Sequence, residues 1–204
     1  MRFYDRHILP RLTHLAMRQD LLLPYRQRVV SRATGRVLEI GIGSGLNLPL
    51  YPDSVDHVVG VDPSPELLRL AGAASRSDAR EVELINGTAE NLPLEDRSVD
   101  CVITSWTLCS VSDLRQALSE IRRVLKPRGM FSFVEHGLAP EARVQKWQHR
   151  LTPIWSCCAG NCHLDRAPAA LVEESGLQTE RLKTGYAAGP KPIVFMYEGL
   201  ARRA

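Results

Sequence analysis

Residues 37–45, VLEIGIGSG, constrain the fold of this chain more than any other stretch. The segment begins with residues that are apolar except for Glu39, as expected for a strand buried on both faces of a parallel sheet. Gly41, Gly43 and Gly45 then allow a sharp turn and the close approach of a ligand to the backbone. Ligands of open parallel sheets bind at the carboxyl ends of the strands, so we expect a binding site at this turn.

The composition is that of a soluble globular protein, because 44% of the 204 residues are hydrophobic and 24% are charged. This length suits one domain with a full core, and we expect a single domain over residues 1–204. The formal net charge of +3 is small and the basic residues form no long block. These properties favour a small-molecule partner and argue against nucleic acid.

No apolar run approaches the roughly 18 residues that a membrane span requires. The N-terminal sequence MRFYDRHILPRL also lacks the apolar core of a signal peptide. Five cysteines are an odd number in a chain without an export signal, so we expect reduced thiols in a cytoplasmic protein. The aromatic and basic N-terminus would allow peripheral contact with a membrane surface, and the oligomeric state stays open.

Strand-like and helix-like segments alternate along most of the chain, which predicts an α/β fold with a Rossmann-like, doubly wound, mostly parallel sheet. Seven strands are expected, at residues 36–40, 57–61, 81–85, 99–105, 130–134, 177–184 and 193–198. The connection at 189–192 is too short for a helical crossover, so the last strand should be antiparallel. Residues 1–34 have helical spacing and are interpreted as an N-terminal helical cap.

Two helix starts carry capping signals. Ser64 suits the N-cap position and Pro65 the first helical position. Asp113 is followed three residues later by Gln116, the spacing of a capping box. In contrast, residues 138–166 break the alternation of strands and helices, and no element is assigned there.

The glycine turn narrows the class of ligand. A dinucleotide fingerprint would require its last glycine at the position of Leu46, which argues against NAD and against a redox enzyme. Asp62 follows the second expected strand, at about the distance at which an acid binds ribose hydroxyls. The turn therefore favours a nucleoside ligand without a pyrophosphate.

As a set, these motifs resemble the Rossmann-like S-adenosylmethionine-dependent methyltransferases. The set comprises Glu39-x-Gly41-x-Gly43-x-Gly45, Asp62, NGTAENLP at 86–93, SVDCVITSWTL at 98–108 and a helix ending in VLKPRG at 124–129. The resemblance covers about residues 35–136, the expected cofactor-binding half, and the strand pattern extends it over an acceptor-side half at 137–204. It implies S-adenosylmethionine as cofactor and S-adenosylhomocysteine as product.

The resemblance also implies roles for individual residues. Those expected at the cofactor are Glu39 with the backbone of Gly41, Gly43 and Gly45 at the methionine end, Asp62 at the ribose hydroxyls, Pro63 or Ser64 beside the adenine, Thr88 and Ala89 at the adenine edge, and Ser105 and Trp106 closing the site. Many relatives carry an aspartate at the position of Thr88 that binds the adenine amino group. Here the Thr88 hydroxyl, or Glu90, would take over that bond.

Two further segments are similar to a methyltransferase-like family whose better-known members are microsomal alkyl-thiol methyltransferases. One combines LCSV at 108–111 with Glu135-His136 at the end of the fifth expected strand, and the other is WSCCAGNCHLDR at 155–166. The similarity implies methyl transfer to a small, fairly apolar acceptor, with a thiol favoured. Known animal members carry an N-terminal membrane anchor, which this sequence does not show.

Candidate catalytic residues lie on the acceptor side. An oxygen or thiol acceptor must lose a proton, and histidine is the commonest base near neutral pH. His136 is the first candidate, because its strand end should point at the site, and His163 with Asp165 is the second.

Cysteines and a histidine also gather at Cys157, Cys158, Cys162 and His163. Their C-C-x3-C-H spacing does not match the C-x2-C pairs of structural zinc sites, so no metal is expected. Two other functions stay open. One is C-, O- or N-methylation of a quinone, a phospholipid head group or a small metabolite, and the other is regulation by a catalytically silent S-adenosylmethionine-binding protein.

Overall fold

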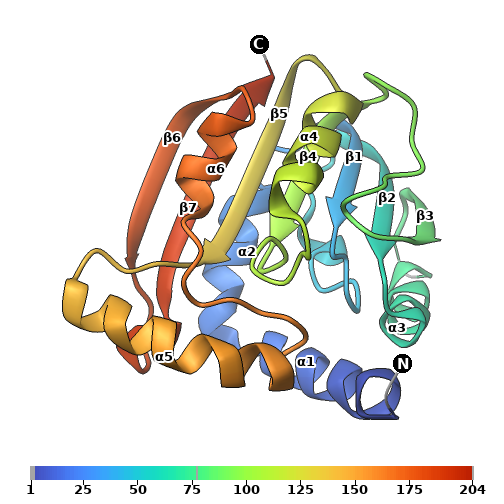
Figure 1. Ribbon diagram of the computed structural model, residues 1–204. Coiled ribbons are helices and arrows are strands. Elements are labelled where there is room, and N and C mark those ends of the chain that lie inside the picture. The colour runs from blue at the N-terminus through green and yellow to red at the C-terminus, as the bar shows by residue number, and fades with distance from the viewer. Residues whose placement is uncertain (1–2, 77, 204) are drawn as a thin grey trace.

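Seven strands form one sheet with helices on both faces (Figure 1). The computed structural model describes residues 3–76 and 78–203. Its strands are β1 Gly35–Ile40, β2 Val55–Asp62, β3 Glu81–Asn86, β4 Val99–Ser105, β5 Leu125–His136, β6 Leu177–Tyr186 and β7 Phe195–Arg203. Their order is β3-β2-β1-β4-β5-β7-β6, and β7 pairs antiparallel with both neighbours. The predicted α/β sheet with an antiparallel last strand is confirmed.

The order of the strands reverses between β1 and β4. From β1 the chain moves outward to β2 and β3, and then returns to place β4 on the other side of β1. In open α/β sheets, the connections on the two sides of such a point diverge and leave a crevice at the carboxyl ends of the strands. The glycine turn follows β1 at this crevice.

Six α-helices surround the sheet. They are α1 Leu9–Met17, α2 Leu23–Val30, α3 Pro65–Ser75, α4 Leu114–Val124, α5 Ala142–Cys158 and α6 Pro168–Glu174 among the described residues. Helices α2 and α3 pack on one face of the sheet and α4 and α6 on the other, whereas α1 and α5 lie across its carboxyl-end edge (Figure 1). The division of the chain into a cap and two functional halves stays a prediction.

Alternation along the strands produces two cores. In β1, Val37 belongs to the core under α2, and its neighbour Leu38 belongs to the core under α4. In β4, Val102 and Ile103 divide in the same way. Successive side chains of a strand point to opposite faces, so a strand that is apolar at nearly every position supplies both layers.

Both predicted helix caps are present. The Ser64 hydroxyl accepts a hydrogen bond from the Leu67 amide at 3.3 Å, with Pro65 at the first helical position. An Asp113 carboxylate oxygen accepts from the Gln116 amide at 3.0 Å and begins α4. These local signals place the starts of the two helices that flank the crevice.

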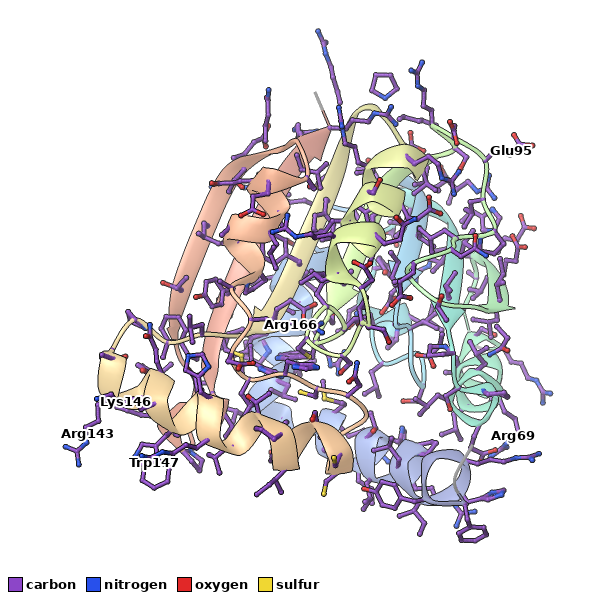
Figure 2. The ribbon with its side chains drawn as sticks, in the orientation of Figure 1. Arg69, Glu95, Arg143, Lys146, Trp147 and Arg166 are labelled. Carbon is purple, nitrogen blue, oxygen red and sulfur yellow. The ribbon has the colours of Figure 1, made fainter. Side chains whose placement is uncertain are left out.

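Helix α5 occupies a stretch in which the sequence predicted no element. Its buried residues are polar: the Gln148 amide accepts from the Ala139 amide at 2.9 Å and donates to the Gly137 carbonyl at 2.9 Å. Its other side chains are largely exposed, and Arg143 and Trp147 project away from the sheet (Figure 2). The large apolar residues of the helix, Trp147, Leu151, Ile154 and Trp155, are exposed, and polar bonds hold the helix to the fold. None of the described helices is long and apolar enough to cross a membrane.

Strand β5 begins earlier than its sequence predicted. The KPRG segment at 126–129 was expected to end the preceding helix, but the strand already begins at Leu125. Leu125 pairs with Val99 and Met130 with Cys101, so the longer segment bulges between these two pairs. Arg128 absorbs the bend with a left-handed φ of 61°.

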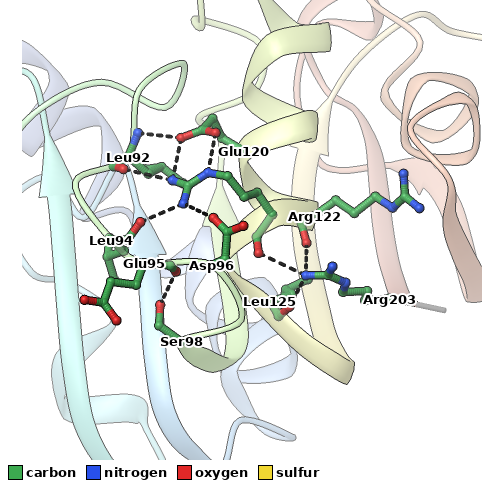
Figure 3. Close-up of polar contacts among 10 residues, drawn as sticks. Leu92, Leu94, Glu95, Asp96, Ser98, Glu120, Arg122, Leu125 and Arg203 are labelled. Carbon is green, nitrogen blue, oxygen red and sulfur yellow. Dashed lines mark hydrogen bonds and ion pairs between the residues drawn. The ribbon is translucent and has the colours of Figure 1, made fainter.

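An arginine fixes the loop that leads from β3 to β4. Arg123 donates to the Leu94 carbonyl at 2.7 Å and to the Leu92 carbonyl at 3.0 Å, and pairs with Glu120 at 2.7 Å. Glu120 also accepts from the Leu92 amide, as Figure 3 shows. These bonds join the loop to α4 and hold the Thr88 segment, which precedes it, against the crevice.

Candidate active site

A cavity of about 370 Å³ lies at the carboxyl ends of β1, β2 and β4, beneath α1. Most of the residues predicted at the cofactor line it: Gly41, Asp62, Pro63, Thr88, Ala89, Ser105 and Trp106. Ser64 and Glu90, the two alternatives considered beside them, line it too. The cavity therefore gathers residues from four separate segments that the sequence had assigned to one ligand.

Asp62 ends β2 with its carboxylate held by backbone donors. One oxygen accepts from the Gly43 amide at 3.0 Å, and the other accepts from the Ser64 amide at 2.8 Å. Burial raises the pKa of Asp62, and these two hydrogen bonds counteract that rise. Since each carboxylate oxygen offers two acceptor positions, both oxygens remain able to accept from ligand hydroxyls.

Two glycines are required by the shape of the turn. Gly41 has a φ of +70°, and a Cβ there would lie 2.2 Å from the Thr107 hydroxyl oxygen. Gly45 has a φ of +78°, and its Cβ would meet Leu48 at 2.9 Å. Any side chain would both strain the backbone and push the turn away from its neighbours. Of these two, only Gly41 lines the cavity, as Gly45 packs behind the turn.

Glu39 is buried behind the turn and does not line the cavity. Its two oxygens accept from the Asn47 amide at 2.7 Å and from the Tyr51 hydroxyl at 2.8 Å. Arg26 donates to the Asn47 side-chain oxygen at 3.0 Å. Burial raises the pKa of Glu39 to about 7, although these donors and Arg26 favour its charged form. Its contacts are those of a residue that positions the loop after β1.

Trp106 closes the cavity in a strained conformation. Its φ of 53° lies in the left-handed region, which is unusual for a bulky residue. Its amide donates to the Val134 carbonyl at 2.8 Å, and the Arg26 guanidinium lies 5.1 Å from the centre of its ring. Strained residues persist where the surroundings fix them, often at functional sites.

The candidate catalytic residues do not line the cavity. His136 is buried, and its Nε2 atom lies 2.9 Å from the Cys162 sulfur. His163 lies 3.4 Å from the Asn161 side-chain oxygen, whereas Asp165 contacts His149 Nδ1 at 2.9 Å. The structure therefore does not pair His163 with Asp165. Burial lowers the pKa of His163, which favours its neutral form.

Glu90 is an ionised carboxylate at the cavity wall with its own structural task. It accepts from the Ser112 amide at 2.8 Å and the Asp113 amide at 3.2 Å, just before α4. Burial raises the pKa of Glu90, but the surrounding donors outweigh it, and the net shift is downward. The lining thus contains two carboxylates, Asp62 and Glu90, and each accepts hydrogen bonds from two backbone amides.

Sequence reasoning did not identify the individual residues of the wall opposite the sheet. Leu9, Pro10 and Thr13 of α1 and Ala159 and Gly160 after α5 complete the cavity. These segments meet, because the Tyr4 hydroxyl donates to the Cys158 carbonyl at 2.7 Å. The helical spacing of residues 1–34 predicted helices there. It did not show that α1 would lie against the segment that follows α5.

The fold and the cavity define a class. A Rossmann-like sheet with a glycine turn after β1, an acid ending β2 and a leucine, Leu46, in place of the last glycine of a dinucleotide fingerprint is typical of S-adenosylmethionine-dependent methyltransferases. The residues fit this cofactor, because Asp62 faces the cavity with free acceptor positions and Gly41 leaves its backbone bare.

Comparison with known proteins supports the same class. Residues 38–133 match the methyltransferase domain family, and this part of the chain belongs to it. Thiol S-methyltransferase TMT1B of Rattus norvegicus is 34% identical over 151 residues, which are 72% of this chain and 62% of that protein. Thiol S-methyltransferase TMT1A of Homo sapiens is 32% identical over 152 residues, with the same coverage. The chain spans 62% of the length of these two curated relatives.

Solved structures show the same fold. The YcgJ protein of Bacillus subtilis superposes with a TM-score of 0.65 at 21% identity and covers 89% of this chain and 95% of its own. A SAM-dependent methyltransferase from Thermotoga maritima has a TM-score of 0.68 at 24% identity and covers 97% of this chain and 99% of its own. S-adenosylmethionine is the cofactor of this class.

We predict that Glu39 makes stability fall between about pH 4.5 and 7. The unfolded chain loses its Glu39 proton near pH 4.5, whereas the folded protein keeps it to about pH 7. In this window the folded state holds more protons, so the free energy of unfolding falls as pH rises, by about 3 kcal/mol. Urea denaturation at pH 4.5 and pH 7.5 should show this loss in the wild type and not in Glu39→Gln. Equal losses in both would contradict the prediction.

Proposed function

We propose that the protein transfers a methyl group from S-adenosylmethionine to a small, fairly apolar thiol. The observation that carries this proposal is the Asp62 carboxylate, fixed at the cavity by Gly43 and Ser64 with acceptor positions left for ribose hydroxyls. The bound cofactor would supply a methyl group on a positively charged sulfur. Asp62, Gly41 and Thr88 would orient the nucleoside end, and Trp106 with the α1 residues would exclude water.

The thiol acceptor is supported by two observations. Relatives at 32–36% identity are named thiol S-methyltransferases. In addition, the wall opposite the sheet contains Leu9, Pro10, Ala159 and Gly160, which suit an apolar acceptor better than a charged one. Methylation of an amine, a quinone or a phospholipid head group in preference to a thiol would support the alternative acceptors.

Peripheral membrane contact is supported by an exposed apolar face, which we call the α1–α5 face. It consists of Phe3, Ile8, Leu12, Leu15, Leu21 and Leu23 near the N-terminus and Trp147, Leu151, Ile154 and Trp155 of α5. Leu182 is the one other large hydrophobic residue that is exposed among the described residues. Such a concentration on one side of a molecule marks an interaction surface.

Basic residues surround the α1–α5 face. Exposed arginines and a lysine on its two helical segments are Arg6, Arg11, Arg18, Arg143, Lys146 and Arg150. Trp147 lies beside Arg143 and Lys146 on α5 (Figure 2). Apolar and aromatic side chains with basic neighbours fit the surface of an anionic lipid bilayer. Because the α1–α5 face borders the cavity, an apolar acceptor would reach the site from the lipid.

We expect S-adenosylhomocysteine to raise the melting temperature of the protein. At about 100-fold over its dissociation constant, the added stability would be roughly 2.7 kcal/mol. Asp62→Ala should remove most of the shift, because it deletes the ribose acceptor. Asp56→Ala, an exposed carboxylate of the same strand, is the control and should keep it. A shift with NADH and none with S-adenosylhomocysteine would overturn the proposed function.

Turnover should favour thiols over other acceptors. The test uses S-adenosylmethionine with a labelled methyl group. It measures transfer of the label to each member of a panel of apolar thiols, phenols, quinones and amines. We expect thiols to give the highest kcat/KM, because the wall opposite the sheet is mainly apolar and offers no charged group to an amine. Preference for an amine or quinone would discard the thiol, and cofactor binding without transfer to any acceptor would indicate a silent regulator.

We predict binding to anionic vesicles through the α1–α5 face. Cosedimentation with vesicles of phosphatidylcholine and phosphatidylglycerol should exceed that with phosphatidylcholine alone and should weaken at high salt. Ile154→Asp should reduce binding roughly tenfold or more. The substitution removes an apolar side chain that would insert into the bilayer, and it adds a negative charge that anionic lipids repel. Leu182→Asp, the exposed leucine outside the face, should bind as the wild type does. Equal loss in both variants would refute this surface.

A further inference from the structure

Three soft ligand groups meet behind one wall of the cavity. They are Cys109 in the loop after β4, His136 at the end of β5 and Cys162 in the loop after α5. The Cys162 sulfur lies 2.9 Å from His136 Nε2 and 3.7 Å from the Cys109 sulfur. All three ligand atoms lie within 4.8 Å of one another, Cys109 and Cys162 are buried, and His136 is 9% exposed.

Their spacing is close to that of a tetrahedral zinc centre. Two sulfurs that each bind zinc at about 2.3 Å lie about 3.8 Å apart, and a sulfur and an imidazole nitrogen lie about 3.5 Å apart. The Cys109–Cys162 distance of 3.7 Å matches the first value. His136 Nε2 is about 0.6 Å closer to Cys162 than the second value requires, so these two atoms would move apart by that amount on binding zinc.

The chemistry of the three groups points to the same ion. Thiolate and imidazole ligands favour zinc, whereas Mg²⁺ and Ca²⁺ require oxygen ligands. Two thiolates and a neutral imidazole around Zn²⁺ carry no net charge, so the centre can be buried without an isolated charge in the core. Both cysteines are free thiols and hence available.

We propose that Cys109, His136 and Cys162 bind one zinc ion and leave its fourth position to an exogenous ligand. Within the described residues, the group contains no fourth cysteine, histidine or acid. Three protein ligands and an open position are the pattern of zinc sites that bind a substrate. Cys109 lies between the lining residues Thr107 and Ser110, and Cys162 follows Gly160, so the site borders the cavity.

The acceptor thiol would take the fourth position, a role that rests on the proposed function. On binding to zinc, the thiol releases its proton to water. The sulfur then forms a bond to the methyl carbon with its own electron pair. The bond between that carbon and the sulfonium sulfur breaks, and its electron pair stays on the former sulfonium. The product thioether is a neutral, weaker ligand and leaves. Zinc would thus take the place of the candidate bases His136 and His163, neither of which lines the cavity.

The first test is metal content. The reduced full chain, prepared without a metal-chelating tag, should contain about one zinc per chain by mass spectrometry of the metal. Cys109→Ala and Cys162→Ala should each lose at least about nine tenths of it. Cys157→Ala, an exposed thiol near the same loop, is the matched control and should retain it. A zinc-free wild type that also fails to bind added zinc, or equal loss in Cys157→Ala, would overturn the site.

The second test needs no substitution and therefore does not depend on the variants folding. Cobalt(II) added to the metal-free wild type should give the visible bands of a tetrahedral ion and a thiolate charge-transfer band. An apolar thiol should strengthen the charge-transfer band, and its S-methyl product should not. Equal responses to both would overturn the role of the fourth position. A protein without a metal centre that still responds to S-adenosylhomocysteine would refute the zinc site alone, whereas a zinc protein without that response would refute the proposed function.

Discussion

The Asp62 carboxylate joins the two segments that form the ligand edge of the sheet. It accepts from the Gly43 amide in the turn after β1 and from the Ser64 amide just before α3. Ser64 in turn caps α3 through the Leu67 amide. Charge-assisted bonds of this kind are about twice as strong as neutral ones, so a single side chain fixes both the turn and the helix start. The surface that would hold a nucleoside is therefore also a structural joint of the fold.

A second buried carboxylate supports the same edge from behind. Glu39 accepts hydrogen bonds from the side chains of Asn47 and Tyr51, which follow the glycine turn. Arg26 of α2 donates to Asn47 and extends this network to the helix. Burial raises the pKa of both Glu39 and Asp62, so ionising either carboxyl in the folded protein costs free energy. Asp62 lines the cavity, and Glu39 lies behind the turn. A ligand with a positive charge lowers that cost, since an opposite charge favours the ionised carboxylate. The electrostatics thus agree with a sulfonium cofactor better than with a neutral or anionic nucleoside.

Local patterns predicted the sheet well. The fourth strand has the expected residues 99–105, and the caps at Ser64 and Asp113 begin their helices where expected. The burial of Glu39 was also readable, because residues two apart in a strand share a face and Val37 lies in the core under α2. Its expected contact with the cofactor followed the motif and did not consider this alternation.

Contacts between distant segments were not readable from the sequence. Helix α5 is held by Gln148, whose partners Gly137 and Pro192 lie far from it along the chain. No apolar period reports such bonds. Cys109 and Cys162 are 53 residues apart, so no local spacing links them. The pairing of His163 with Asp165 failed for the same reason, since the loop turns Asp165 toward His149 on α5.

The two sides of the cavity are built by different means, and this decides where specificity lies. The cofactor side consists of strand ends whose register is fixed by the sheet. The acceptor side consists of α1 and the end of α5, joined by the bond from Tyr4 to the Cys158 carbonyl and by the close approach of Leu9 to Gly160. A change in these contacts would reshape the acceptor wall and leave Asp62 in place. Under the proposed function, the choice of acceptor would therefore depend on helices at the exposed edge of the molecule, next to the cluster of Cys109, His136 and Cys162.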